Sequence, residues 1–254
     1  MLGFFKLKRS WEWAAYGKHP VARDYFSTCD HIPILKAFSA WVEKGFQSLK
    51  PGQSKESWNS FRFWIKGPQK DLILGTLHDS SDSIGRKFPL LIIGTGPLKD
   101  WEKNWEMLTH ICEKTWTRAE YLACKRYSDI KMLESDIRAM PTLQADGSDH
   151  TDKNHQADPP QGITKSPDLK PQLRELVQNG KALFQIAPLP SSDLQESADH
   201  LHLLLKKELG PYTPNAIFTT VLSGEENMIV FKRPLVTEDF SFLVEAAKLP
   251  GYGR

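Results

Sequence analysis

Hydrophobic and polar residues alternate or form short apolar runs in the first half of the chain, as is typical of β-strands. Segment 61–66, FRFWIK, alternates between two sides, which predicts a half-exposed strand with Trp64 on its outer side. Segments 71–77 and 88–94, DLILGTL and FPLLIIG, predict two more strands. The second of these is so apolar that we expect it near the middle of a sheet.

Other segments of this half repeat apolar residues at helical spacing. In segment 32–46 the apolar face consists of Ile34, Phe38, Trp41 and Val42. After Pro97 the residues at i, i+4, i+7 and i+11 are Trp101, Trp105, Leu108 and Cys112. A further apolar face is formed by Ile130, Leu133, Ile137 and Met140. These spacings predict three helices in the first half.

The second half also mixes helices and strands. The expected elements are, in order, a helix at 173–178, a strand at 182–187, a helix at 191–210, strands at 216–222 and 228–232, and a last helix. Ser192 begins a capping box for the middle helix, and Thr237 is the expected N-cap of the last one. The short loop between the last two strands predicts an antiparallel hairpin.

The elements together predict an α/β (α+β) fold with a single central mixed, partly antiparallel sheet and helices packed on its faces. Residues 144–172 break the pattern, because they contain no aromatic and only four aliphatic residues. We expect this stretch to be a flexible polar insert. Neither half has enough strands to be stable alone, so residues 1–143 and 173–254 are expected to form two parts of one domain.

Composition narrows the classes of function. The net charge is only +2, which gives no overall field for binding nucleic acid or an anionic membrane. The three cysteines are widely spaced and form no CxxC pair, which is typical of a reducing compartment. The N-terminal apolar run is too short for a signal peptide, and no segment is long enough to span a bilayer. We therefore expect a cytoplasmic protein without membrane insertion.

Two polar segments carry the candidate chemistry. Segment 16–26, YGKHPVARDYF, holds Lys18, Arg23 and Asp24 among aromatic residues, and the loop after residue 78 holds Asp82 and Arg86. Either segment could be a turn, a docking surface or a reaction centre. The chain has no phosphate-binding loop, nucleophile elbow or zinc-protease motif. We therefore assign no catalytic residue, no cofactor and no metal site.

The same segments resemble the TagF (ImpM) family of type VI secretion-associated proteins. GKHPVARDYF resembles that family's N-terminal signature, roughly G-K-x-P-x-x-G-D-F. Segment 57–67, SWNSFRFWIKG, is similar to its tryptophan-rich strand, and residues 80–90 to its block P-S-x-D-x-x-G-R-x-F-P-L. Residues 217–244 resemble the family's closing hairpin and helix. The likeness covers both ends of the chain and leaves the polar insert out.

The resemblance implies a cytoplasmic regulator that acts after translation and restrains type VI secretion. It implies a forkhead-associated scaffold protein as the partner, in a pathway with a Ser/Thr kinase and phosphatase, and no catalysis. We expect the charged groups of the two polar segments to form a buried network that fixes two loops, with Arg62 in support and Trp64 as exposed contact area. The candidate partner-binding residues are Lys18, Arg23, Asp24, Arg62, Trp64, Asp82 and Arg86.

Two alternatives stay open. A hydrolase or phosphoryl-transfer enzyme would use Asp24 or Asp82 as its base and Arg86 to clamp an anion. That alternative predicts a concave pocket that joins the two loops. A structural component of the secretion baseplate is the other alternative.

Overall fold

A computed structural model of the chain describes residues 10–28, 32–50, 52, 58–143, 169–186, 194–222 and 225–248. Its strands form one sheet in the order β2-β1-β5-β4-β3-β7-β8-β6. Their bounds are β1 Glu12–Gly17, β2 Phe26–Ser27, β3 Phe61–Lys66, β4 Asp71–His78, β5 Leu90–Pro97, β6 Lys181–Ile186, β7 Ala216–Leu222 and β8 Glu225–Phe231. The helices are α1 Pro33–Gln47, α2 Leu108–Cys124, α3 Ile130–Arg138, α4 Lys170–Asn179, α5 Leu194–Leu209 and α6 Asp239–Ala246. Short 3-10 turns cover Pro68–Lys70 and Trp105–Met107.

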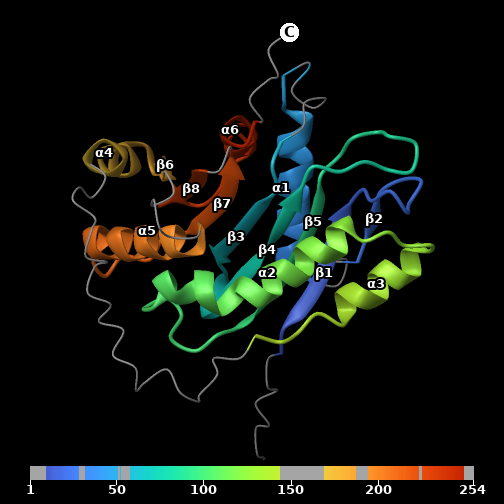
Figure 1. The fold of residues 1–254 in the computed structure, drawn as a ribbon, viewed down its shortest axis with the longest axis horizontal. Coiled ribbons are helices and arrows are strands. Elements are labelled where there is room, and N and C mark those ends of the chain that lie inside the picture. The colour runs from blue at the N-terminus through green and yellow to red at the C-terminus, as the bar shows by residue number, and fades with distance from the viewer. Residues whose placement is uncertain are drawn as a thin grey trace, which may run out of the picture.

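The sheet lies between two layers of helices (Figure 1). Helices α2, α3, α4 and α5 cover one face, and α1 and α6 cover the other. Each face has its own hydrophobic core, because neighbouring side chains of a strand point to opposite sides. None of the helices in the described ranges is long and apolar enough to cross a membrane.

The predicted fold class is confirmed. Every strand pairing is antiparallel, so the sheet is antiparallel throughout. Strand β3 pairs with β7, which means that segments before and after the polar stretch build the same sheet. Residues 144–168 of the expected insert lie outside the described residues, whereas 170–172 form the first turn of α4. The strand predicted at 61–66 is observed with the same bounds.

The expectation of an exposed Trp64 was wrong. Its side chain is 1% exposed and packs against Trp101 and Trp105, with ring centroids 5.6 and 6.0 Å away. The alternation in FRFWIK marks two buried faces, because helices cover both sides of β3. A single strand does not reveal how many helices cover it.

Two helix starts differ from the predictions. The residues around Trp101 form turns, and α2 begins only at Leu108. The N-cap of α6 is Glu238 in place of Thr237. The carboxylate of the next residue, Asp239, accepts hydrogen bonds from Arg233 and from the Val236 N–H and pairs with Lys181. Ser192 of the predicted capping box lies outside the described residues.

Candidate functional site

The two polar segments meet at one edge of the sheet, where β1 ends beside the start of β5. Gly17 is the last residue of β1 and pairs with Leu90. Its φ is +127°, and a Cβ atom there would lie 1.9 Å from the Pro89 carbonyl oxygen. Only glycine allows this close approach of the two backbones. The glycine that opens the first signature therefore sets the distance between the two segments.

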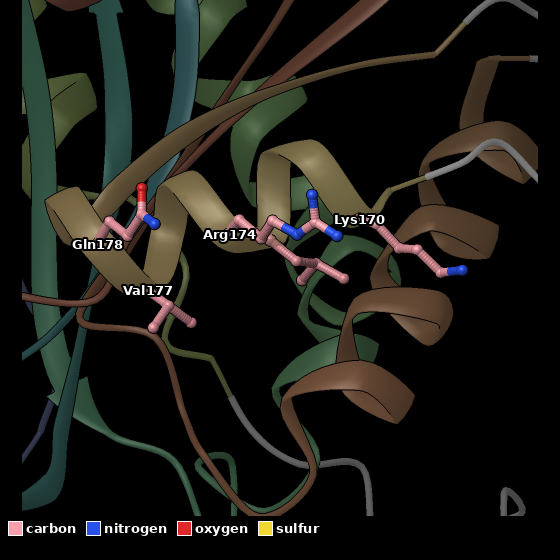
Figure 2. A pocket seen from close by; sticks show the side chains of 5 residues that line it. Lys170, Arg174, Val177 and Gln178 are labelled. Atoms are coloured by element: carbon pink, nitrogen blue, oxygen red, sulfur yellow. The ribbon is translucent and has the colours of Figure 1, made fainter.

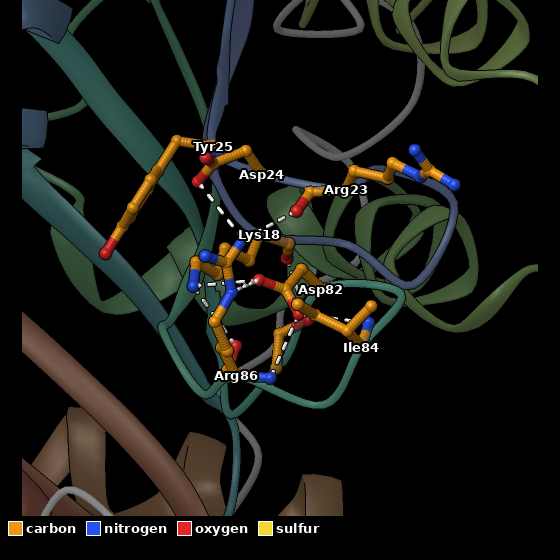
Figure 3. A network of polar contacts seen from close by, with 8 residues as sticks. Lys18, Arg23, Asp24, Tyr25, Asp82, Ile84 and Arg86 are labelled. Atoms are coloured by element: carbon orange, nitrogen blue, oxygen red, sulfur yellow. Dashed lines mark hydrogen bonds and ion pairs between the residues drawn. The ribbon is translucent and has the colours of Figure 1, made fainter.

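A buried carboxylate, that of Asp82, joins the segments (Figure 3). One of its oxygens, Oδ2, lies 3.0 Å from Lys18 Nζ and 2.7 Å from Arg86 Nε. The other, Oδ1, accepts hydrogen bonds from the backbone N–H groups of Ile84 and Arg86. The Asp82 and Lys18 side chains are 0% and 5% exposed. Asp82 thus folds its own loop and holds the opposite segment at the same time.

Further hydrogen bonds hold the segments together on either side of Asp82. Arg86 Nη2 donates to the Arg23 carbonyl oxygen at 2.7 Å and lies 3.7 Å from Asp24 Oδ1. The Ser80 hydroxyl donates to the Lys18 carbonyl oxygen, and the Ser83 N–H donates to the Ala22 carbonyl oxygen, both at 2.8 Å. The contacts therefore run along the whole boundary between the segments. We name residues 18–25 and 79–88 the signature platform.

Hydrogen bonds within the platform favour the ionised forms of Asp82 and Arg86. Burial alone would raise the pKa of Asp82, but hydrogen bonds from Lys18, Arg86 and the backbone outweigh it and hold that pKa well below its ordinary value. The hydrogen bond to Asp82 raises the pKa of Arg86. A carboxylate with a lowered pKa and both oxygens occupied is a weak proton acceptor.

The outer side of the platform presents apolar and charged side chains to solvent. Ile84, at the tip of the second loop, is 69% exposed, and Gly85 beside it has a φ of +83°. Tyr25 is 51% exposed and rests edge-on against Phe88, with ring centroids 4.7 Å apart. In Figure 3 the Arg23 side chain points away from the network, whereas its carbonyl oxygen faces it.

Arg62 does not belong to the platform. Its guanidinium lies between two carboxylates of α2, with Nη1 2.6 Å from Glu113 Oε2 and Nε 2.7 Å from Glu120 Oε1. Strand β3 is separated from β1 by β5 and β4, so Arg62 fixes α2 to the sheet instead. Trp64 lies in the core of the same face. The structure brings together Lys18, Arg23, Asp24, Asp82 and Arg86 from the predicted set.

Sequence reasoning missed two histidines, His19 within the platform and His78 directly before its second segment. His78, the last residue of β4, lies 2.7 Å from the Ser60 hydroxyl through Nδ1, and burial lowers its pKa to about 4. His19 accepts a hydrogen bond from the Val21 N–H through Nδ1 and packs edge-on against Tyr127. Burial lowers the pKa of His19 as well. In the sequence, only their positions within or next to the signature segments could have drawn attention to these histidines.

Nothing in the described part of the chain gathers three or more His, Cys, Asp or Glu side chains for a metal ion. Asp79 pairs with Lys87 at 3.2 Å and Asp82 with Lys18 and Arg86, so these carboxylates contact cationic side chains. The arrangement is suited to holding two backbone segments in fixed positions.

Comparison with known proteins places both segments in one family. A sequence model described as TagF N-terminal domain, type VI secretion system-associated, matches residues 14–140, which is half of the chain. The crystal structure of PA0076 from Pseudomonas aeruginosa PAO1 has a similar fold, with a TM-score of 0.52 and 13% identity over 91% of this chain and 93% of that chain. No curated protein matches the chain. The signature platform lies wholly within the matched residues, and the chain belongs to the TagF family of type VI secretion-associated proteins.

Proposed function

We propose that this chain is a non-enzymatic cytoplasmic regulator of a type VI secretion system and represses it after translation. It acts by binding a forkhead-associated scaffold protein through the signature platform, in a pathway that includes a Ser/Thr kinase and phosphatase. Membership of a type VI secretion-associated family supports this role. The observation that carries the proposal is the buried Asp82, which joins the two signature segments into one surface.

The geometry of Asp82 supports binding over catalysis. A general base must have a free oxygen and a pKa near the working pH. Both Asp82 oxygens already accept hydrogen bonds, and its pKa is lowered. Arg86 donates to Asp82 and to the Arg23 carbonyl, so these donors are already engaged within the chain. The hydrolase alternative therefore has no supporting observation at this site.

The exposed side chains of the platform have the chemistry of a protein contact. Ile84 and Tyr25 expose apolar surface on a backbone that hydrogen bonds already hold in place. Preorganised surfaces lose little entropy on binding, and a few aromatic or aliphatic anchors supply most of the affinity. Arg23 and Arg86 at the rim would set the orientation of the partner.

The test is a titration of the purified forkhead-associated scaffold into the full chain. Ile84→Glu should raise the dissociation constant roughly 10-fold or more, because it places a charge in an apolar contact. Met132→Glu is the matched control, since Met132 is also an exposed apolar residue but lies on α3. Both variants should keep the wild-type melting temperature. Unchanged affinity of Ile84→Glu, or no binding by the folded wild type at micromolar concentration, would contradict the proposal.

A further inference from the structure

Strand β6 ends the sheet on the side opposite to the signature platform. In the described part of the chain it pairs only with β8, and its register runs from Lys181 opposite Phe231 to Ile186 opposite Glu226. A terminal strand has one row of backbone N–H and C=O groups that no neighbouring strand satisfies. Such an edge is a template for another extended chain.

The register identifies the backbone groups of β6 that face away from β8. The Lys232 N–H donates to the Gly180 carbonyl oxygen at 2.7 Å, so this pair belongs to the hydrogen-bonded positions of the ladder. Hydrogen-bonded positions alternate along an antiparallel pair, so the backbone groups of Ala182 and Phe184 face β8. The N–H and C=O groups of Leu183 and Gln185 face away from the sheet.

Natural sheets usually protect such edges with proline, bulges or a lysine at the edge. Strand β6 contains no proline, and its pairing with β8 runs without a bulge over all six residues. Its one lysine, Lys181, points toward α6, where it pairs with Asp239 at 3.0 Å and lies 4.4 Å from the ring centre of Phe242. Gln185 is exposed and uncharged. The described edge therefore has no proline, no bulge and no charged side chain that points outward.

The two sides of this edge differ in chemistry. On the α6 side, Leu183 and Phe242 are partly buried apolar residues. On the α4 side, a groove of about 340 Å³ is lined by Lys170, Leu173, Arg174, Val177 and Gln178. Val177 is 68% exposed, and Figure 2 shows Arg174 and Lys170 extending from the first half of α4. An added strand would therefore have apolar residues near it on the α6 side of the sheet, whereas the helix on the other side, α4, carries cationic residues.

We propose that β6 is a second docking site, which takes an extended segment of a partner protein as an additional antiparallel strand. The segment alternates apolar residues, on the side of Leu183 and Phe242, with acidic residues, on the side of the sheet where α4 carries Lys170 and Arg174. Charge complementarity favours such a partner over a second copy of this chain. Two-fold pairing of β6 with itself would put both α4 helices, each carrying Lys170 and Arg174, on the same side of the joint sheet, which gives no charge complementarity.

The probe is a synthetic heptapeptide of alternating valine and glutamate, capped at both ends, titrated into the full chain. It should bind and slow hydrogen exchange at the Leu183 and Gln185 amides, which face the edge. The Gln185→Pro variant removes an outward N–H without touching the ladder to β8, and it should weaken binding roughly 10-fold. Gln185→Thr keeps the N–H and should bind as the wild type does. Arg174→Glu should weaken binding by a similar factor.

Several results would overturn the proposal. In the free chain, hydrogen exchange at the Leu183 and Gln185 amides should be faster than at Ala182 and Phe184. Equally slow exchange at all four amides would mean that the edge is already covered. Equal binding by the wild type and Gln185→Pro, or no binding by either, would exclude strand addition. If the chain forms dimers and dimerisation slows hydrogen exchange at the same amides, the site on β6 is occupied by a second copy of the chain. The Ile84→Glu variant should bind the peptide normally, so this site is tested separately from the platform.

Discussion

Asp82 is the residue on which the signature platform depends. Asp82→Ala should lower the melting temperature by about 10 °C, because it leaves Lys18 buried without its partner carboxylate. Asp24→Asn is the control and should leave the melting temperature unchanged, since that carboxylate is mostly exposed and lies 3.7 Å from Arg86. Calorimetry of both variants makes the comparison. An Asp82→Ala variant as stable as the wild type would make Asp82 a contact residue and not an organising one.

Protonation of Asp82 should destabilise the fold in acid. Its folded pKa lies below its unfolded value, so its contribution to the free energy of unfolding is present above about pH 4 and is lost as the pH falls further. Urea unfolding of the wild type and of Asp82→Asn between pH 5 and pH 2.5, as an approximate window, measures this. The difference in stability between the two proteins should shrink toward low pH. A constant difference would mean that Asp82 does not titrate between the two states in this way.

His78 should give a separate loss of stability at higher pH. Its folded pKa is about 4 and its ordinary value is 6.5, so the unfolded chain binds more protons between these values. The free energy of unfolding should therefore fall by about 3 kcal/mol as the pH drops from 6.5 to 4. His78→Asn keeps an acceptor for the Ser60 hydroxyl and should remove most of this slope, leaving the part due to His19. An unchanged slope would assign the effect to other groups.

At the scale of the elements, the approach of β1 to the start of β5 sets the position of both signature segments. Gly17→Ala should destabilise the chain far more than Gly85→Ala. Both glycines have positive φ, which alone costs another residue about 1–2 kcal/mol, but only at Gly17 does the added Cβ meet backbone, 1.9 Å from the Pro89 oxygen. Chemical denaturation of the two variants tests this. Equal losses of stability would show that the backbones separate easily.

The elements also show which strands the sequence pattern predicts correctly and which it misses. The apolar run at 88–94 and the alternation at 61–66 predicted strands, because strand periodicity depends on local burial. Strand β1 was missed, since Trp13 and its two alanines are buried on both faces and leave no polar alternation. The burial of Trp64 was missed for a different reason: it shares one side of the strand with Arg62 and Lys66, although helices cover both faces of β3. Which helix covers which face is decided by contacts between distant segments.

The platform was partly predictable. The sequence indicated that Arg86 would pair with Asp82 or Asp24, and its guanidinium lies 2.7 Å from Asp82 and 3.7 Å from Asp24. The buried Lys18 was not singled out as the partner of Asp82, because two segments about 62 positions apart in the sequence give no signal for individual pairs. Arg62 was expected to support this network. Its strand lies farther into the sheet, and its side chain pairs with Glu113 and Glu120 of α2.

At the scale of the whole molecule, one antiparallel sheet carries two candidate docking surfaces at opposite edges. The platform lies at the end of the order that runs from β2 to β4, and β6 is four strands beyond β4, which separates the two surfaces by about 20 Å at the usual strand spacing. Occupation of one surface therefore leaves the other sterically accessible. A chain built in this way is suited to contact two partners at once.

The central claim is that the signature platform, held by Asp82, is the surface that binds the forkhead-associated scaffold. Hydrogen exchange of the full chain with and without saturating scaffold measures this most directly. We expect slower exchange at residues 22–25 and 82–88 in the complex, with α3 unchanged. A stable complex whose exchange differs from that of the free chain only outside these two segments would contradict the account.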